Sequence, residues 1–347
     1  MNSQVTIRDV AKATGFSVNT VSRALNDKPD VSAETKRVIL ESVKKLGYRP
    51  NKLARGLRSN KTQTIGVIVT DIANPFFAAV VKGVEQAARE RNWSIILGNT
   101  DEDYEKEKEV IQTMLAERVD GLLLTPTQTN KGTVIELKAS GFPFVLLGRR
   151  FDDLDTDYVV TDDVQGGFLA TEHLLSLGRE KIAMINGPLH ISSAKERFQG
   201  YKKALEHFGI PLDRSIVKGG AITTDDGYEI SKALLNHESC LTGIFAYSDF
   251  VAFGAMRAIR EAGLKIPDDI AIIGYDNIEF SSCLEVPLTS IEIPEQKLGS
   301  TAVSILDERI RDRTKDVLRS ILEVKLISRP STTQMPQYSM QQTSTGR

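Results

Sequence analysis

Five short or hydrogen-bonding side chains stand together near the start of the chain, just after a glycine and a serine. Gly15 occupies a position where a turn between two helices needs a residue that tolerates positive φ, and Ser17 is a good N-cap because its oxygen can accept an unpaired first-turn N–H. This layout is typical of a helix-turn-helix, whose second helix lies in the DNA major groove. An ordinary helix pair in an α-rich domain is the alternative. The five side chains are those of Val18, Asn19, Thr20, Ser22 and Arg23.

The helices that must position these side chains are short and amphipathic. Apolar residues recur at helical spacing within 6–26, so two helices can pack against each other. A third helix is predicted after Ser32, and it ends at the sequence GYRP at 47–50. Three helices of this size make a small head, residues 1–50, with little core of its own.

The next segment, 51–60, is basic and weakly helical. It is interrupted by Gly56, and isolated helices shorter than ~12–15 residues are marginal in water. We therefore expect a hinge helix that folds only against DNA and a second copy of the chain. A plain linker is the alternative, but Leu53 and Leu57 are unusual choices for a solvated tether.

Charge is distributed unevenly over the 347 residues. The first 60 residues hold 12 Lys and Arg against 5 Asp and Glu, a net charge of +7, so the remainder carries −9. A basic head on an acidic body indicates that the head meets a polyanion. Cys240 and Cys283 form no pair or metal cluster, the amino terminus lacks a signal peptide, and no apolar run approaches the ~20 residues that span a bilayer. We expect a soluble, cytoplasmic, nucleoid-associated protein with no membrane partner.

From Thr64 onward, strands alternate with helices, beginning with a near-continuous apolar run at 64–71. Repeated βαβ units predict doubly wound parallel sheets, and so many strands favour two lobes with a cleft between them, over residues 61–330. The tail 331–347, rich in Gln, Ser and Thr, is predicted to be disordered. Strands are expected at 64–71, 94–99, 121–125, 144–147, 158–161, 181–186, 215–218, 243–247, 270–275 and 289–292. Helices are expected at 75–91, 104–118, 133–140, 164–177, 192–208, 226–236, 250–262 and 294–312.

Residues for catalysis or metal binding do not cluster in the sequence. The four histidines, His173, His190, His207 and His237, show no spacing of a metal site or a nucleophilic triad. Neither G-x-G-x-x-G nor G-x-x-x-x-G-K-[ST] occurs. We therefore expect no enzyme activity, no metal and no cofactor.

Eight short motifs, in order along the chain, resemble the LacI/GalR family of transcriptional regulators over roughly residues 5–330. They are TIRDVA at 6–11, TVSRALN at 20–26, GYRPN at 47–51, ARGL at 54–57, NPFF at 74–77, RVDG at 118–121, TEHL at 171–174 and GYDN at 274–277. The resemblance implies a homodimer on a pseudo-palindromic double-stranded DNA operator. It also implies a periplasmic-binding-protein-like body that holds a sugar or sugar derivative between its lobes. One branch of the family binds a phosphorylated carrier protein as corepressor, and nothing in this sequence assigns that partner.

The resemblance places base contacts on three residues of the second helix, Val18, Asn19 and Arg23. The residue types suit this role, because Arg pairs with guanine, Asn with adenine and Val with the thymine methyl. The alternative for each is an exposed helix residue. In the hinge, Leu57 matches a leucine that wedges into the minor groove, with Arg55 beside it. Phosphate contacts are expected from Thr6, Ser17, Thr20, Ser22 and Asn26.

In the body, Asn74, Phe76 and Phe77 follow the first strand, where ligands bind doubly wound sheets. Aromatic rings stack on the apolar face of a sugar, although one of the two phenylalanines is expected in the core. The resemblance places Arg197 and Asp276 on sugar hydroxyls, and a charged carboxylate makes the stronger hydrogen bonds. For Arg197 the alternative is a surface helix charge.

Three positions depart from sugar-binding relatives, which often carry Asp at Gly148, Asn at Ser248 and Gln at Glu292. Arg149 is retained. Because Gly148 supplies no acid beside Arg149 and Arg150, the site could suit an acidic sugar such as a uronate or aldonate, although Glu292 could supply the missing carboxylate. Arg149, Ser248 and Glu292 therefore complete the expected effector site.

We interpret the chain as a repressor of carbohydrate-metabolism genes controlled by a sugar or sugar-acid effector, which could either release or promote DNA binding. A solute-binding receptor fits the body but not the basic head. A doubly wound enzyme with an accessory head lacks a catalytic constellation.

Overall fold

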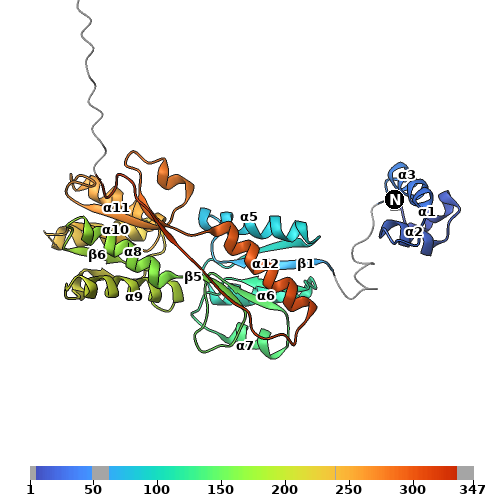
Figure 1. The fold of residues 1–347 in the computed structure, drawn as a ribbon, viewed down its shortest axis with the longest axis horizontal. Coiled ribbons are helices and arrows are strands. Elements are labelled where there is room, and N and C mark those ends of the chain that lie inside the picture. Colours follow the sequence, from blue (N-terminus) through green and yellow to red (C-terminus); the bar gives the residue numbers. More distant parts are fainter. Residues whose placement is uncertain (1–4, 49–61, 239, 334–347) are drawn as a thin grey trace, which may run out of the picture. The chain divides into compact units, whose positions relative to one another are not determined.

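The structure is a computed structural model that describes residues 5–48, 62–238 and 240–333 (Figure 1). The chain divides into two compact units, the first ending at Thr62 and the second beginning at Gln63. Each unit has a buried core of its own, so we describe the head and the body separately.

The head is a three-helix unit around one small core. Gly15 has a φ of 73° and ends the first helix, and the Ser17 side chain accepts the backbone N–H of Thr20 at 3.0 Å. Both turn and cap therefore form as the sequence predicts. Val10 and Val21 are fully buried between the helices. The helices are α1 (Ile7–Thr14), α2 (Val18–Leu25) and α3 (Ala33–Leu46).

The body contains two six-stranded sheets, one in each of two lobes (Figure 1). The N-lobe sheet has the order β11-β5-β4-β3-β1-β2 and is parallel throughout. The C-lobe sheet has the order β12-β10-β9-β8-β6-β7, and only β12 runs antiparallel. The N-lobe strands are β1 (Thr64–Val69), β2 (Ser94–Asn99), β3 (Gly121–Leu124), β4 (Phe144–Leu147), β5 (Tyr158–Thr161) and β11 (Arg319–Leu322). The C-lobe strands are β6 (Ile182–Ile185), β7 (Val217–Lys218), β8 (Gly243–Ala246), β9 (Ala271–Asp276), β10 (Thr289–Glu292) and β12 (Lys325–Ile327).

Helices cover both faces of each sheet, which explains the continuous apolar runs. Successive strand side chains point to opposite faces. Val67 accordingly packs with α5 and α12, while Ile68 packs with α6 and α7. In the C-lobe, α8 and α9 cover one face and α10 and α11 the other. The helices are α5 (Pro75–Glu90), α6 (Tyr104–Ala116), α7 (Gly132–Ala139), α8 (Asp163–Ser176), α9 (Ser192–His207), α10 (Thr224–His237), α11 (Asp249–Glu261) and α12 (Glu295–Arg311). The predicted head with a two-lobed parallel α/β body is confirmed.

The chain passes between the lobes three times: from β5 to α8, from β10 to α12, and from β11 to β12. Each lobe is therefore assembled from separate stretches of sequence. Among the described residues, no helix combines the length and the apolar character needed to cross a bilayer.

The carboxyl-terminal end differs from the prediction in two ways. The predicted elements stop at residue 312, whereas β11 and β12 follow; β11 is missing from the prediction because it is short and exposes Arg319 and Ile321. The predicted tail also starts too early. Ser331 is buried, accepts the backbone N–H of Thr289 at 2.8 Å and donates to the carbonyl of Ile272 at 2.7 Å. These hydrogen bonds join it to the C-lobe.

Candidate functional site

The second helix of the head presents an exposed polar face. Asn19, Arg23 and Asn26 are exposed, and the Arg23 guanidinium forms an ion pair with Asp30 that leaves about half of each side chain accessible. Val18 is half-buried against the head core, so only part of its side chain is free for a thymine methyl. The predicted base contacts thus lie on one short helix.

Hydroxyl groups order the amino ends of the first two helices. The Thr6 hydroxyl donates to Asp9 at 2.7 Å, and the hydroxyls of Ser17 and Thr20 lie 2.8 Å apart. Thr6 and Ser17 are exposed, while Thr20 and Ser22 are half-buried. Helix amino ends ordered in this way are suited to phosphate contacts. Two further predicted DNA contacts, Arg55 and Leu57, lie outside the described residues together with the rest of 51–60.

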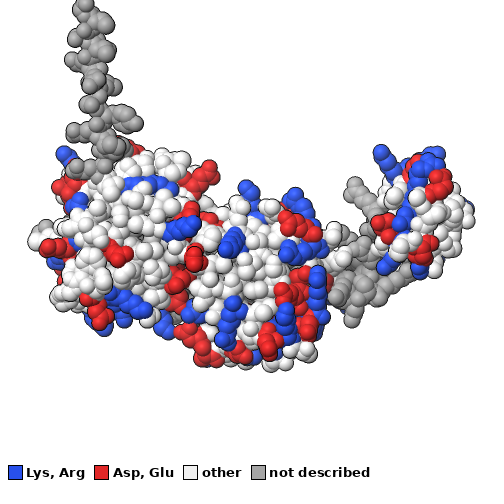
Figure 2. All heavy atoms as spheres, in the orientation of Figure 1, with Lys and Arg blue, Asp and Glu red and all other residues white. Residues whose placement is uncertain are grey.

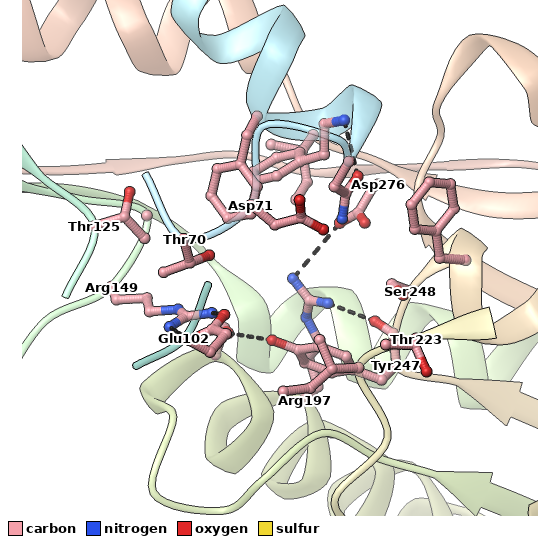
Figure 3. A pocket seen from close by; sticks show the side chains of 18 of the residues that line it. Thr70, Asp71, Glu102, Thr125, Arg149, Arg197, Thr223, Tyr247, Ser248 and Asp276 are labelled. Atoms are coloured by element: carbon pink, nitrogen blue, oxygen red, sulfur yellow. Dashed lines mark hydrogen bonds and ion pairs between the residues drawn. The ribbon is translucent and has the colours of Figure 1, made fainter. Parts of the chain in front are cut away.

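A cavity of about 330 Å³ lies between the two lobes of the body (Figure 3). In the N-lobe it is lined by residues at the carboxyl ends of β1, β3, β4 and β5, and in the C-lobe by residues at the ends of β8 and β9. This is the edge at which parallel α/β sheets bind ligands. Seven of the eight predicted effector residues line it: Asn74, Phe76, Phe77, Arg149, Arg197, Ser248 and Asp276.

Arg197, on α9, is a buried cation that lines the cleft. It is 5% exposed, its Nε donates to Asp163 at 2.8 Å, and its guanidinium donates to the carbonyl of Tyr247 at 2.5 Å. The guanidinium carbon lies 3.5 Å from the ring centre of Tyr275. Burial acts to lower the pKa of Arg197, but Asp163 and the other groups around it raise it. The side chain is therefore charged and is held in place by contacts within the protein.

Close helix packing places Arg197. A Cβ atom on Gly167 of α8 would lie 2.2 Å from the backbone oxygen of Arg197, so only glycine lets the two helices approach this closely.

Asp276 ends β9 in an unusual backbone conformation, with a φ of 104°. It is 5% exposed, and one carboxylate oxygen lies 3.9 Å from the guanidinium of Arg197. Burial raises the pKa of Asp276 well above its ordinary value, against the lowering effect of Arg197. The buried Asp249 supports the following loop, because it accepts the Ile278 N–H at 2.9 Å and the Ser281 hydroxyl at 2.6 Å.

Arg149 occupies the N-lobe side of the same cavity (Figure 3). Its two terminal nitrogens donate to the two carboxylate oxygens of Glu102 at 2.8 and 2.6 Å, and one also donates to the carbonyl of Pro126 at 3.0 Å. Burial acts to lower the pKa of Arg149, but the Glu102 carboxylate raises it. Glu102 is a lining residue that sequence reasoning missed, because it stands in the loop after β2, remote from every motif.

Aromatic rings supply the apolar wall. Asn74 caps α5 by accepting the N–H of Phe76 at 3.0 Å, and Pro75 opens the helix. The rings of Phe76 and Phe77 meet edge to face, with centroids 5.0 Å apart. Both rings are half-buried, and both line the cavity as well as packing on the core.

Glu292 is the predicted residue that the structure does not bring to the cleft. It does not line the cavity and instead accepts the side-chain amide of Asn277 at 3.3 Å. Ser248, which does line it, caps α11 by accepting the Val251 N–H at 3.3 Å. Lining residues that the sequence did not single out include Thr70, Asp71, Thr125, Thr161, Asp163, Ser193, Thr223, Asp225, Tyr247 and Phe250. Several stand at the carboxyl end of a predicted strand, as Asp71, Thr125 and Tyr247 do, and that position was the available signal.

Polar contacts join the lobes at the edge of the cleft. Arg150, in the N-lobe loop after β4, forms an ion pair with Glu196 of α9 at 2.7 Å. Lys195 pairs with Asp152 at 3.0 Å. Because α9 belongs to the C-lobe, these two ion pairs cross between lobes; we call them the interlobe latch. Burial, with Asp163 nearby, raises the pKa of Glu196 to about 7 despite the Arg150 pair.

Both units match described families. Residues 6–51 match the bacterial regulatory proteins of the lacI family, and residues 62–329 match the periplasmic binding proteins and sugar binding domain of the LacI family. The HTH-type transcriptional repressor PurR of Pasteurella multocida (strain Pm70) is 36% identical over 321 residues, which cover 92% of this chain and 95% of that protein.

Solved structures agree over nearly the whole chain. The Lac repressor dimer bound to operator and the anti-inducer ONPF has a TM-score of 0.85 at 30% identity, covering 95% of this chain and all of that chain. The complex of the transcriptional regulator CelR with cellobiose has a TM-score of 0.74 at 30% identity, covering 94% and 100%. With both units matched in order, the chain belongs to the LacI family of DNA-binding transcriptional repressors.

Proposed function

We propose that the chain represses carbohydrate-metabolism genes in the cytoplasm as a homodimer on a pseudo-palindromic operator, under the control of a neutral sugar or sugar derivative held between the lobes. The observation that carries this proposal is the cavity itself. Two arginines held by carboxylates, the buried Asp276 and the half-buried rings of Phe76 and Phe77 surround one space at the carboxyl ends of both sheets.

The chemistry of the lining supports a sugar. Aromatic rings can stack on the C–H face of a sugar ring, and the buried carboxylate of Asp276 can accept hydrogen bonds from hydroxyl groups. The volume of about 330 Å³ is near the lower end of the usual range for ligand cavities, about 300–1,000 Å³, and favours a small ligand. The cellobiose complex of CelR gives a related chain with a sugar ligand.

The charges favour a neutral ligand over a sugar acid. The expectation of a uronate or aldonate depended on two arginines without an acid beside them. Arg149 is paired with Glu102, and Arg150 does not line the cavity but pairs with Glu196. This arrangement supports a neutral ligand rather than an acidic sugar.

Control would act through lobe closure. In this mechanism, ligand-driven closure shifts the N-lobes of the dimer and changes the spacing of the two hinge segments at 51–60, so that they fold together in the minor groove or separate. A shift from 1:99 to 99:1 needs about 5.5 kcal/mol of differential binding, which two ligands favouring one state by about 3 kcal/mol each would supply. The same mechanism allows an inducer or a corepressor.

Selection of bound DNA sequences from a random pool, with and without neutral sugars such as cellobiose and ribose, tests this proposal. We expect a palindromic consensus sequence. One sugar should change the affinity for that sequence by at least about tenfold, which corresponds to a difference in binding free energy of about 1.4 kcal/mol. Sugar binding without any DNA footprint would favour a solute-binding receptor, and turnover of the bound sugar would favour an enzyme. DNA binding that no sugar affects would contradict the assignment of the effector.

A further inference from the structure

A sharp turn after β2 directs one carboxylate into the cleft. Asp101 and Glu102 both lie in the left-handed region, with φ of 52° and 58°, which side-chain-bearing residues adopt only at an energetic cost. Asp103 then caps α6 by accepting the N–H of Glu105 at 2.7 Å. Asp101 pairs with Lys106 at 2.7 Å outside the cleft, whereas Glu102 lines it. Backbone geometry thus separates two adjacent acids into different environments.

The Glu102–Arg149 pair extends along the edge of the N-lobe sheet. Glu102 follows β2 and Arg149 follows β4, and in the sheet these strands are separated by β1 and β3. The two side chains are 20% and 7% exposed, and they share two hydrogen bonds. Thr70, at the end of β1, is buried at the cavity wall, and its hydroxyl has no hydrogen-bond partner among the described residues. A ligand at this end of the cleft would meet a donor, an acceptor and an unused hydroxyl.

The Glu102 carboxylate also neutralises the positive charge of Arg149 at this end of the cleft. Gly148 carries no acid beside Arg149, and the carboxylate comes instead from Glu102, far away in sequence. On the C-lobe side, Arg197 is balanced by Asp163 and Asp276. Both lining arginines are therefore neutralised by carboxylates that line the same cavity.

We infer that Glu102 determines which ligand charge the cleft accepts: by occupying Arg149 with two hydrogen bonds, it excludes anionic ligands and leaves the pair to bind neutral hydroxyl groups. This inference rests on the proposed function, since it concerns the same ligand cleft. Arg149 is the group that a ligand carboxylate would bind in bidentate fashion if Glu102 did not hold it. A ligand carboxylate would also be repelled by Glu102 itself.

The test uses the full-length chain and measures binding of glucuronate, galacturonate and acetate by calorimetry, with glucose and galactose as neutral counterparts. Glu102→Gln keeps the shape of the side chain and removes its charge. Asp101→Asn removes the same charge from the same turn without touching Arg149, and is the matched control. The double variant Glu102→Gln with Arg149→Gln removes the cation that the inference invokes.

We expect Glu102→Gln to bind at least one of the three anions roughly tenfold more tightly than the natural chain, as expected for the gain of a charge-assisted pair. Asp101→Asn should show no gain, and the double variant should lose it. The inference is overturned if Glu102→Gln gains no anion binding, if Asp101→Asn gains as much, or if the gain survives loss of Arg149. These outcomes do not depend on which neutral sugar acts on DNA binding, so they are distinct from failure of the proposed function.

Discussion

The two arginines of the cleft are held in different ways. In the C-lobe, Arg197 is bonded to Asp163, stacked on Tyr275 and placed by the contact of two helices. In the N-lobe, Arg149 stands in the loop two residues after the end of β4, and it is held by Glu102, which lies in the turn after β2. The C-lobe end of the cleft is therefore built into the core of its lobe, whereas the N-lobe end is defined by loops that substitutions can change without repacking a core.

In each lobe, the arginine that lines the cavity is adjacent in sequence to a residue that forms an ion pair with the other lobe. Arg149 points inward while Arg150 reaches the other lobe, and Arg197 points inward while Glu196 meets Arg150. Each lobe thus uses two consecutive residues, one for the cavity and one for the latch between lobes. The residues that line the cavity and the residues that join the lobes are consequently adjacent in the sequence.

The largest expected difference between the two ends of the cleft is in the stability that is lost when the arginine is replaced by alanine. Arg197→Ala leaves Asp163 and Asp276 buried without their cation, and breaking such a pair costs about 3–5 kcal/mol. Arg149→Ala should cost less, about 1–3 kcal/mol, because Glu102 is more exposed and can turn toward water. Thermal unfolding of the two full-length variants measures the difference. Equal losses of stability would show that the N-lobe arginine is just as much a part of its core.

Glu196 of the interlobe latch should make the free energy of unfolding depend on pH. Glu196 has its pKa raised from 4.5 to about 7, chiefly by burial and by Asp163, against the effect of Arg150. Between these values the folded chain holds a proton that the unfolded chain has released, so this group's contribution to stability falls as pH rises from about 4.5 to 7. The loss is up to roughly 3 kcal/mol, since one pKa unit corresponds to about 1.4 kcal/mol.

Glu196→Gln should therefore flatten the fall of the melting temperature between pH 5 and 8. Glu295 and Asp249, whose pKa values burial raises to about 7 and about 6, act in the same direction and should keep part of the slope. Glu206→Gln removes an exposed carboxylate from the other end of α9 and is the control. If wild type and Glu196→Gln melt with the same pH profile, Glu196 does not titrate in this range.

A smaller difference in stability is expected between substitutions of two glycines, Gly167, which packs against Arg197, and Gly148, which precedes Arg149. An added Cβ at Gly167 would meet the backbone of Arg197 at 2.2 Å, and overpacking of this kind costs about 1–3 kcal/mol. At Gly148, which precedes Arg149, an added Cβ would lie in open space. Only the φ of 72° disfavours a side chain at this position. Gly167→Ala should thus destabilise more than Gly148→Ala, whose backbone strain costs about 1–2 kcal/mol. The melting temperatures of the two variants rank them, and the reverse order would show that α8 and α9 can move apart.

These contrasts also explain what the sequence could predict. Strands and helices of the body follow from apolar runs buried under helices, as at Val67 and Ile68, and the carboxyl ends of the strands locate the cleft. Glu102 and Asp163 were not predicted, because their partners stand 47 and 34 residues away and a carboxylate in a loop carries no periodic signal. Glu292 was misplaced because its side chain turns to Asn277 rather than to the cavity.

In the head, local rules were sufficient for the fold. Gly15 and Ser17 determine the turn and the cap from within a few residues, so the helix pair could be predicted without any long-range information. The base contacts remain predictions, since an exposed Arg23 beside Asp30 is compatible with either DNA or solvent.

The smallest effect is expected from the exposed ion pair of the latch. Lys195 and Asp152 are 64% and 59% exposed, so their attraction is screened, and Lys195→Ala should cost about 0.5 kcal/mol or less. By contrast, Arg150 and Glu196 are 22% and 13% exposed, so Arg150→Ala should cost more. Melting temperatures at low and high salt separate the cases, because salt should erase the Lys195→Ala effect and leave most of the Arg150→Ala effect. A large, salt-resistant loss for Lys195→Ala would mean that α9 is held to the N-lobe by the outer pair, and that lobe closure is controlled from the surface rather than from the edge of the cavity.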